Sequence, residues 1–277
     1  MAETSLTTLE DLNTLGVENL TAMIGQAGMG KPANVGIPRL AIEQMADNDD
    51  GDKLPKGEYR LRIESKDYYI KNPTVRFYVR YFSYDSFNSE SPKDSPRTVL
   101  KPSLKDEFPD SKGGNKCGKL TTQEIEALPE SSKLKVAQKS IKCTQVVYGY
   151  IDGKCEGTTL DGETEDLDGT PFVYSVRGSA FQPVWNFIGK LGQKTIMFSL
   201  KLRLSTKRNK MGSVTYFTPE IEEFDKVSIV DDDVKRISFI MDDISSYNDR
   251  IVSMHKEHLK DKLTGEELAV SDSLEVA

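Results

Sequence analysis

Apolar and polar residues alternate along several stretches of the chain, so that an apolar residue stands at every second position. A period of two places successive side chains on opposite faces of a strand, so each stretch is typical of a strand with one buried face. In the first, Tyr59, Leu61 and Ile63 alternate with arginines. The predicted strands are 59–63, 74–84, 143–151, 172–177 and 195–218, the last turning back through a loop at 206–212.

Two stretches change to the helical period. Phe181, Trp185 and Ile188 recur behind Ser179, a good helix cap, and Gly192 is placed to end that helix. Between 237 and 254 apolar residues recur every three or four positions, which predicts a long amphipathic helix over 234–260.

These elements predict a β-rich α+β fold: an OB-like antiparallel barrel or sandwich of five or more strands, with flanking N- and C-terminal helices. Residues 1–36 read as a leucine-bearing arm and a Gly-rich linker, 37–225 as the OB-like domain, and 226–277 as a C-terminal helix and acidic tail. A Pro/Ser/Asp/Lys-rich stretch, 85–116, reads as a long loop.

Composition limits the compartment. No stretch approaches the roughly 18 to 20 consecutive apolar residues of a membrane span, and the first residues lack the pattern of a secretory signal. Three widely spaced cysteines, Cys117, Cys143 and Cys155, are an odd number without a CxxC pair, which favours free thiols in a reducing compartment. We expect a cytoplasmic protein without a membrane partner, in the host cytoplasm if the chain is viral.

Charge is distributed unevenly. The chain carries a formal net charge of −7. Residues 220–277 hold 16 acids against 7 bases, whereas 172–219 hold eight Lys and Arg and no acid. The pattern is that of a basic body with acidic ends, and it bears on partners rather than on fold.

Motifs of catalysis are incomplete. Residues 25–31 fit GxxxxGK, but Pro32 replaces the hydroxyl residue that would hold magnesium, and no buried strand precedes the loop. The only two histidines, His255 and His258, lie together in the predicted C-terminal helix, without a recognised nucleophile near them in the sequence. We therefore expect no enzymatic activity, no cofactor and no metal. A zinc site built from the three cysteines and a histidine stays open as an alternative, although no CxxC pair supports it. Aspartate clusters at 231–233 and 242–243 leave a metal-dependent nuclease open as an alternative.

Cations and aromatic rings share the predicted strand faces. Binding of single strands without sequence preference needs cations along the phosphates and flat rings under the bases. On the strand 74–84, arginines and rings interleave at strand spacing on one face. The alternative, open for every strand, is that Arg and Lys mark the solvated face while Tyr78, Phe82 and Tyr84 pack under a helix. The predicted nucleic-acid-binding residues are Arg60, Arg62, Arg76, Tyr78, Arg80, Phe82, Tyr84, Arg177, Lys201, Arg203, Lys207, Arg208, Lys210 and Tyr216.

A resemblance points the same way. With a basic aromatic body, an N-terminal arm and an acidic C-terminus, and segments such as Pro38-Arg39-Leu40, Cys117-Gly118-Lys119-Leu120 and 176–181, the chain resembles bacteriophage single-stranded DNA-binding proteins of the OB-fold type. The resemblance is one of architecture over roughly 37–277. It implies coating and protection of single-stranded DNA in replication and recombination, with replication or recombination proteins as possible partners of the acidic tail.

The alternative class is a non-enzymatic structural or assembly protein, for instance of a phage virion. In that case the arm at 5–24 and the helix at 234–260 would pack against neighbouring subunits. Stable self-association indifferent to nucleic acid would then be expected. Both hypotheses predict a binding protein, and they differ in the partner.

Overall fold

A computed structural model describes residues 36–48, 50–86, 95–192 and 195–260. The chain divides into two compact units, Met1–Gly36 and Ile37–Ala277. The predicted arm, the GxxxxGK segment and the acidic tail beyond Lys260 lie outside the described residues. All that follows concerns the second unit.

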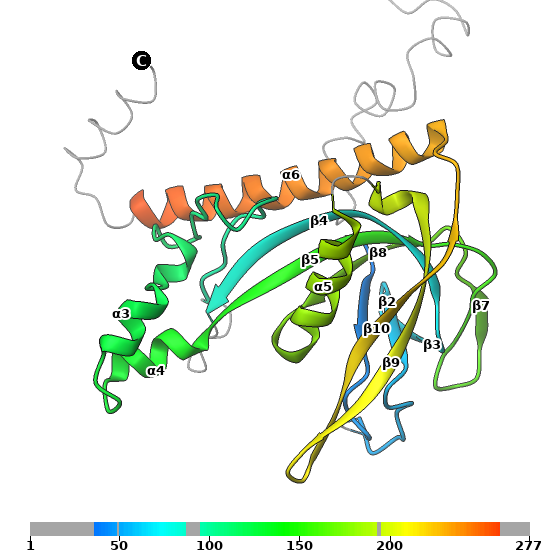
Figure 1. Ribbon diagram of the computed structural model, residues 1–277, viewed down its shortest axis with the longest axis horizontal. Helices are drawn as coiled ribbons and strands as arrows, with labels where there is room; N and C mark the ends of the chain where they lie inside the picture. The colour runs from blue at the N-terminus through cyan, green and yellow to red at the C-terminus, as the bar shows by residue number, and fades with distance from the viewer. Residues whose placement is uncertain (1–35, 49, 87–94, 193–194, 261–277) are drawn as a thin grey trace, which may run out of the picture. The chain divides into compact units, whose positions relative to one another are not determined.

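Ten strands form one mixed sheet (Figure 1). Its order is β10-β9-β4-β5-β8-β1-β2-β3-β6-β7, and among the described strands only β1 and β8 pair in parallel. The strands are β1 (Arg39–Ile42), β2 (Tyr59–Ile63), β3 (Lys66–Ile70), β4 (Thr74–Ser86), β5 (Ile141–Ile151), β6 (Glu156–Thr158), β7 (Thr164–Asp166), β8 (Pro171–Val176), β9 (Leu200–Met211) and β10 (Val214–Lys226). The prediction of a β-rich α+β protein is confirmed. The sheet is single and open, with β10 and β7 at its edges, rather than a closed barrel or a sandwich.

Four α-helices accompany the sheet in the described chain: α3 (Thr122–Ala127), α4 (Lys133–Ser140), α5 (Phe181–Leu191) and α6 (Asp231–Lys260). Short 3-10 turns occur at η3 (Lys116–Gly118), η4 (Gly178–Ala180) and η5 (Met197–Ser199). α5 and α6 match the two predicted helices, and α6 begins three residues earlier than expected. No helix among these described segments is long and apolar enough to cross a membrane.

The two faces of the sheet carry separate hydrophobic cores. The α5-side core includes Leu61, Phe77, Phe172 and Leu202 and is covered by Val184 of α5. The α6-side core lies on the opposite face and is defined by Tyr78, Val146, Tyr148, Ile240 and Ile244. In Figure 1, α6 runs along one face of the curved strands β4 and β5, and α5 lies against the other. Strands buried on both faces explain why β5 is apolar along most of its length.

A β-bulge in β4 reverses which residues face which core. Pairing with β5 slips between Phe77 and Val79, so Tyr78 is an extra residue in β4. Before the bulge Phe77 faces the α5-side core; after it, Val79 and Tyr81 pack against the α6-side core. Because one inserted residue flips every later side chain, a constant period of two does not describe this strand.

Two segments near β9 differ from the structure that the sequence pattern predicts. Most of the expected loop at 206–212 is strand: β9 continues to Met211, and a two-residue turn begins at Gly212, whose φ is 61°. The alternation assigned to 196–204 is broken by η5, which leaves Ile196 exposed and sends Phe198 to the α6-side core.

The stretch 85–116 is not a plain loop. Its first residues complete β4, and its later residues form bridges such as Asp85 with Arg97 and Thr98 with Asp110. Val99, Leu100 and Phe108 are buried there. Sparse periodicity in this stretch therefore marks irregular but packed structure, with residues 87–94 outside the description.

Candidate nucleic-acid interface

The predicted binding face of β4 is divided by the bulge and largely buried. Arg76, Tyr78 and Phe82 are only 6%, 5% and 1% exposed. Arg76 and Tyr78 face α6, whereas Phe82 contacts Trp185 of α5 from the opposite side of the sheet. The expectation of one solvated face carrying Arg76, Tyr78, Arg80, Phe82 and Tyr84 is wrong, because one extra residue at the bulge inverts the alternation.

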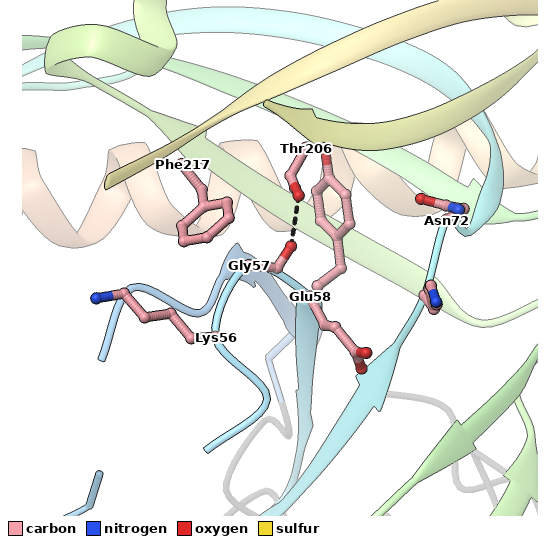
Figure 2. Close-up of a pocket in the computed structure, with 8 residues that line it drawn as sticks. Lys56, Gly57, Glu58, Asn72, Thr206 and Phe217 are labelled. Carbon is pink, nitrogen blue, oxygen red and sulfur yellow. Dashed lines mark hydrogen bonds between the residues drawn. The ribbon is translucent and has the colours of Figure 1, made fainter. Parts of the chain in front are cut away.

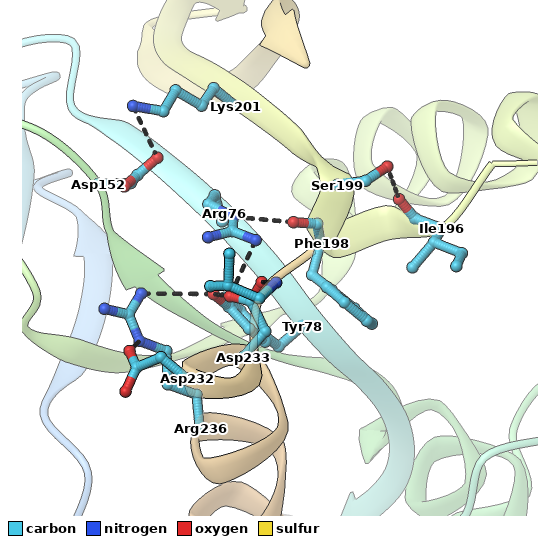
Figure 3. Close-up of polar contacts among 11 residues, drawn as sticks. Arg76, Tyr78, Asp152, Ile196, Phe198, Ser199, Lys201, Asp232, Asp233 and Arg236 are labelled. Carbon is cyan, nitrogen blue, oxygen red and sulfur yellow. Dashed lines mark hydrogen bonds and ion pairs between the residues drawn. The ribbon is translucent and has the colours of Figure 1, made fainter. Parts of the chain in front are cut away.

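Arg76 and Tyr78 instead hold the start of α6 (Figure 3). The Arg76 guanidinium lies 2.9 Å from a carboxylate oxygen of Asp233, to which the Tyr78 hydroxyl also donates at 2.6 Å. The other Asp233 oxygen accepts from the Val230 N–H at 3.0 Å, and Arg76 donates to the Phe198 carbonyl at 2.8 Å. A fully buried carboxylate with these donors is a structural anchor.

The contacts of Asp233 and Tyr78 decide the ionisation state of both side chains. Burial alone would raise the pKa of Asp233, but hydrogen bonds from Tyr78, the Val230 N–H and Arg76 outweigh it and hold the pKa below its ordinary value. Burial, followed by the hydrogen bond to Asp233, raises the pKa of Tyr78 to about 12. At neutral pH, Asp233 is therefore an anion and Tyr78 is a neutral phenol.

On the other face Arg80 lies among aromatic rings. Its guanidinium is 5.0 Å from the centre of the Phe82 ring and 5.3 Å from that of Trp185, which stacks on Phe181. Burial lowers the pKa of Arg80. Tyr84 packs edge-on against Phe108 at 5.1 Å, and burial raises its pKa to about 12. These rings are packed on protein groups rather than aligned as an open stacking platform.

Several predicted cations are already paired. Arg60 contacts Glu43 at 2.9 Å, Arg62 contacts Asp67 at 2.6 Å, Arg177 contacts Asp85 at 3.2 Å, and Lys201 contacts Asp152 at 3.1 Å. Arg203 is exposed and its guanidinium lies 4.4 Å from the centre of the Phe224 ring. A cation with a carboxylate beside it offers less net charge to a phosphate.

The outer part of the β9–β10 hairpin is different. Lys207, Arg208 and Lys210 are exposed, and within the described chain none of the three has a carboxylate within ion-pair distance. Arg208 lies directly opposite Phe217 and Lys210 opposite Thr215. Directly opposed residues of an antiparallel pair share a face, so Arg208, Lys210 and Phe217 lie on one side of the hairpin, and Lys207 and Tyr216 on the other.

Hydrogen bonds from three positions fix this hairpin: Gly57 in the turn before β2, Tyr59 at the start of β2, and Gln44 after β1. The Thr206 hydroxyl donates to the Gly57 carbonyl at 2.6 Å, and the Tyr59 hydroxyl donates to the Ser205 carbonyl at 3.1 Å. The Gln44 side chain bonds both the N–H and the carbonyl of Phe217, each at 2.9 Å. Gln44 thereby satisfies part of the free edge of β10, and the hairpin is held in place.

A cleft of about 300 Å³ lies between the hairpin, the turn that precedes β2 and the turn that follows β3 (Figure 2). The Phe217 ring lies over Gly57, where a Cβ would come within 2.6 Å of it. Glu58 is the one acid among the lining residues, which are Lys56, Gly57, Glu58, Tyr59, Lys71, Asn72, Thr206 and Phe217. With Arg208 and Lys210 on the same hairpin face, this cleft combines cations with an aromatic ring; we name it the hairpin cleft.

The hairpin cleft unites residues that the sequence pattern missed. Lys56, Lys71 and Phe217 were not predicted, because they belong to turns and to a strand thought to begin after a longer loop. A two-residue turn at Gly212 was the available signal: counting outward from it pairs Phe217 with Arg208. The contacts with Gly57 and Gln44 have no local signal, since they join residues about 150 positions or more apart.

In the described part of the chain, cysteines and acids form no metal centre. Cys117, Cys143 and Cys155 are free thiols, and burial raises the pKa of Cys117 to about 12. Within the ranges that the structure describes, no group of three or more His, Cys, Asp or Glu side chains is placed to hold a metal ion.

In comparisons with known proteins, no family model, no curated protein and no solved structure matches this chain.

Proposed function

We propose that this protein binds single-stranded nucleic acid, without sequence preference, on the outer part of the β9–β10 hairpin and in the hairpin cleft. One observation carries the proposal. Lys56 and Lys71 line the hairpin cleft beside the Phe217 ring, Arg208 and Lys210 lie on the same hairpin face as that ring, and Lys207 lies on the opposite face. None of the five has an ion-pair partner among the described residues, whereas the other predicted cations are mostly paired.

The chemistry suits a flexible polyanion. Cations that neutralise phosphates release counterions, which makes binding favourable and sensitive to salt. A ring beside them can stack on a base, and each such stack is worth about 1 to 3 kcal/mol. Since the hairpin is anchored by Gln44, Gly57 and Tyr59, the cations are held in place before the ligand arrives. Coating of single-stranded DNA during replication or recombination is the role we propose, and it requires no catalytic step.

We include an OB-like identity of the sheet in the same proposal. A curved sheet with α5 packed into one face is compatible with an OB-like body whose closure is replaced by side-chain contacts between β10 and the β1 end. The acidic residues after Lys260 are proposed to recruit replication or recombination proteins.

Fluorescence anisotropy with labelled oligo(dT), at low and moderate salt and with duplex competitor, tests the proposal. The variant K207Q/R208Q/K210Q should bind more weakly, and the slope of log affinity against log salt should fall by about 2 for three lost phosphate contacts. The control K105Q/K112Q/K133Q removes the same charge at exposed positions elsewhere and should bind like wild type. Absence of wild-type binding at low salt, or equal losses in both variants, would refute the proposal.

Trp185 reports on the position of the ligand. It is the only tryptophan and stacks beside Arg80 on the α5 side. Binding at the hairpin cleft alone should leave its fluorescence nearly unchanged. Strong quenching by oligo(dT), together with unaltered binding by K207Q/R208Q/K210Q, would move the site to the Arg80 and Trp185 cluster.

A further inference from the structure

α6 carries an exposed apolar seam beside the face that packs on the sheet, and Met241, at the border between the two, accepts a hydrogen bond on its Sδ from the Tyr81 hydroxyl of β4 at 4.0 Å. Its packed face contains Ile240, Ile244 and Ile251, each at most 3% exposed. The second seam contains Val234, Met241 and Val252, which are 63%, 39% and 40% exposed, and the exposed Ser238 and Ser245. At 3.6 residues per turn, this seam lies about a quarter of the way around the helix from the packed face.

The seam has the spacing of a helix pair. Its positions 234, 238, 241, 245 and 252 follow steps of four, three, four and seven, the pattern of residues that face a partner helix. Four of these positions are symmetric about residue 243, namely 234 with 252 and 241 with 245, whereas Ser238 has no counterpart in the seam. In an antiparallel pair of two copies, Val234 therefore faces Val252 of the other copy, and Met241 faces Ser245.

Charge favours the antiparallel direction. Apart from the buried Asp233, residues 231–245 hold four aspartates against Lys235 and Arg236, whereas 246–260 hold three Lys and Arg and two His against two acids. Antiparallel packing places the acidic half of one helix beside the more basic half of the other. Parallel packing would place the two acidic halves together.

We propose that two copies of this chain form an antiparallel dimer through the α6 seam. The contact is weak and reversible, because only three apolar side chains per copy contribute and serines separate them. Figure 1 shows the β9–β10 hairpin directed away from α6, so both hairpins stay accessible in the dimer. This inference is independent of the proposed nucleic-acid binding, and it would stand if that binding failed.

Sedimentation equilibrium over a wide concentration range tests the dimer. Wild-type protein should rise from monomer to dimer mass, and V234E should stay monomeric throughout because the dimer would place its carboxylate in the seam. The control V136E introduces the same charge on α4, at a valine that is 64% exposed, and should dimerise like wild type. A wild type that is monomeric at the highest concentration, or equal effects of both variants, would overturn the proposal.

Cysteine pairing tests the direction. M241C mixed with S245C should give a disulfide-linked dimer under mild oxidation, because the two positions face each other across the antiparallel seam. Each variant alone should link poorly, since like positions are then offset by about 6 Å along the helices. Efficient linking of M241C with itself would indicate a parallel pair and contradict the proposal. Wild-type protein controls for the native thiols.

Discussion

At the scale of single residues, the buried Asp233 shows how position decides the role of a charge. The chain places three aspartates in a row, and only the third is fully buried, between Arg76 and Tyr78. Asp232, one position earlier, is exposed and pairs with Arg236 one turn along α6 at 2.9 Å. The same side-chain chemistry thus serves as an anchor in one case and as a solvated helix pair in the other.

Replacing Asp233 tests the anchor. D233N leaves the Arg76 guanidinium buried without its countercharge, so we expect a loss of about 3 kcal/mol in the free energy of unfolding, measured with urea. The matched control D232N removes an exposed pair and should cost about 0.5 kcal/mol or less. Similar losses in the two variants would show that Asp233 does not anchor α6.

The pH dependence of stability should differ between wild type and D233N. Because the pKa of Asp233 is lowered in the folded protein, its contribution is complete above the unfolded value of about 3.9. That contribution is lost as pH falls through the lower folded value. Wild type should therefore lose more stability than D233N below about pH 4, and parallel pH profiles would contradict this assignment.

At the scale of elements, the docking of the β9–β10 hairpin depends on one glycine. Gly57 has a φ of 92°, and the Phe217 ring occupies the space that a side chain would need. Hairpin and turn are therefore matched in shape as well as joined by the Thr206 hydrogen bond. This contact forms one wall of the hairpin cleft, which is also held by the hydrogen bonds of Tyr59 and Gln44.

G57A should disturb the hairpin more than backbone strain alone explains. We expect the free energy of unfolding to fall by about 2 to 4 kcal/mol, combining strain at positive φ with overpacking against Phe217. G153A is the matched control, because Gly153 has a φ of 98° and open space around its Cβ position, so only the strain remains. Equal losses would mean that the Phe217 ring moves aside without cost.

At the scale of the whole sheet, the two hydrophobic cores share the same strands. β4, β5 and β8 each send residues to the α5-side core from one face and to the α6-side core from the other. Loss of either core would leave those strands without half of their packing. The unit from Ile37 onward is therefore expected to unfold as one cooperative structure.

Urea unfolding followed by two signals tests this cooperativity. Trp185 fluorescence reports on the α5 side, and far-UV circular dichroism is dominated by the 30-residue α6. The two curves should coincide in midpoint and slope. Measurement on V234E removes any contribution from self-association. Separate transitions would show that α6 and its core unfold independently of the α5-side core.

The sequence by itself determined what depends on near neighbours. Periods of two and of three to four predicted β2, β8, α5 and α6, and the acid-free stretch 172–219 predicted a cationic hairpin, because strand and helix patterns and charge runs are local properties. It did not predict α3 and α4, which are short and carry little periodicity.

Only the tertiary structure decided which predicted residues stay available to a ligand. Arg76 and Lys207 look alike in the sequence, but the first meets Asp233, 157 positions away, and the second meets no acid among the described residues. The bulge at Tyr78 has no residue signature, yet it turns half of β4 over. Ion pairs and strand register depend on which distant segments come together, and for that reason a local pattern places the cations along the chain without showing which of them are free.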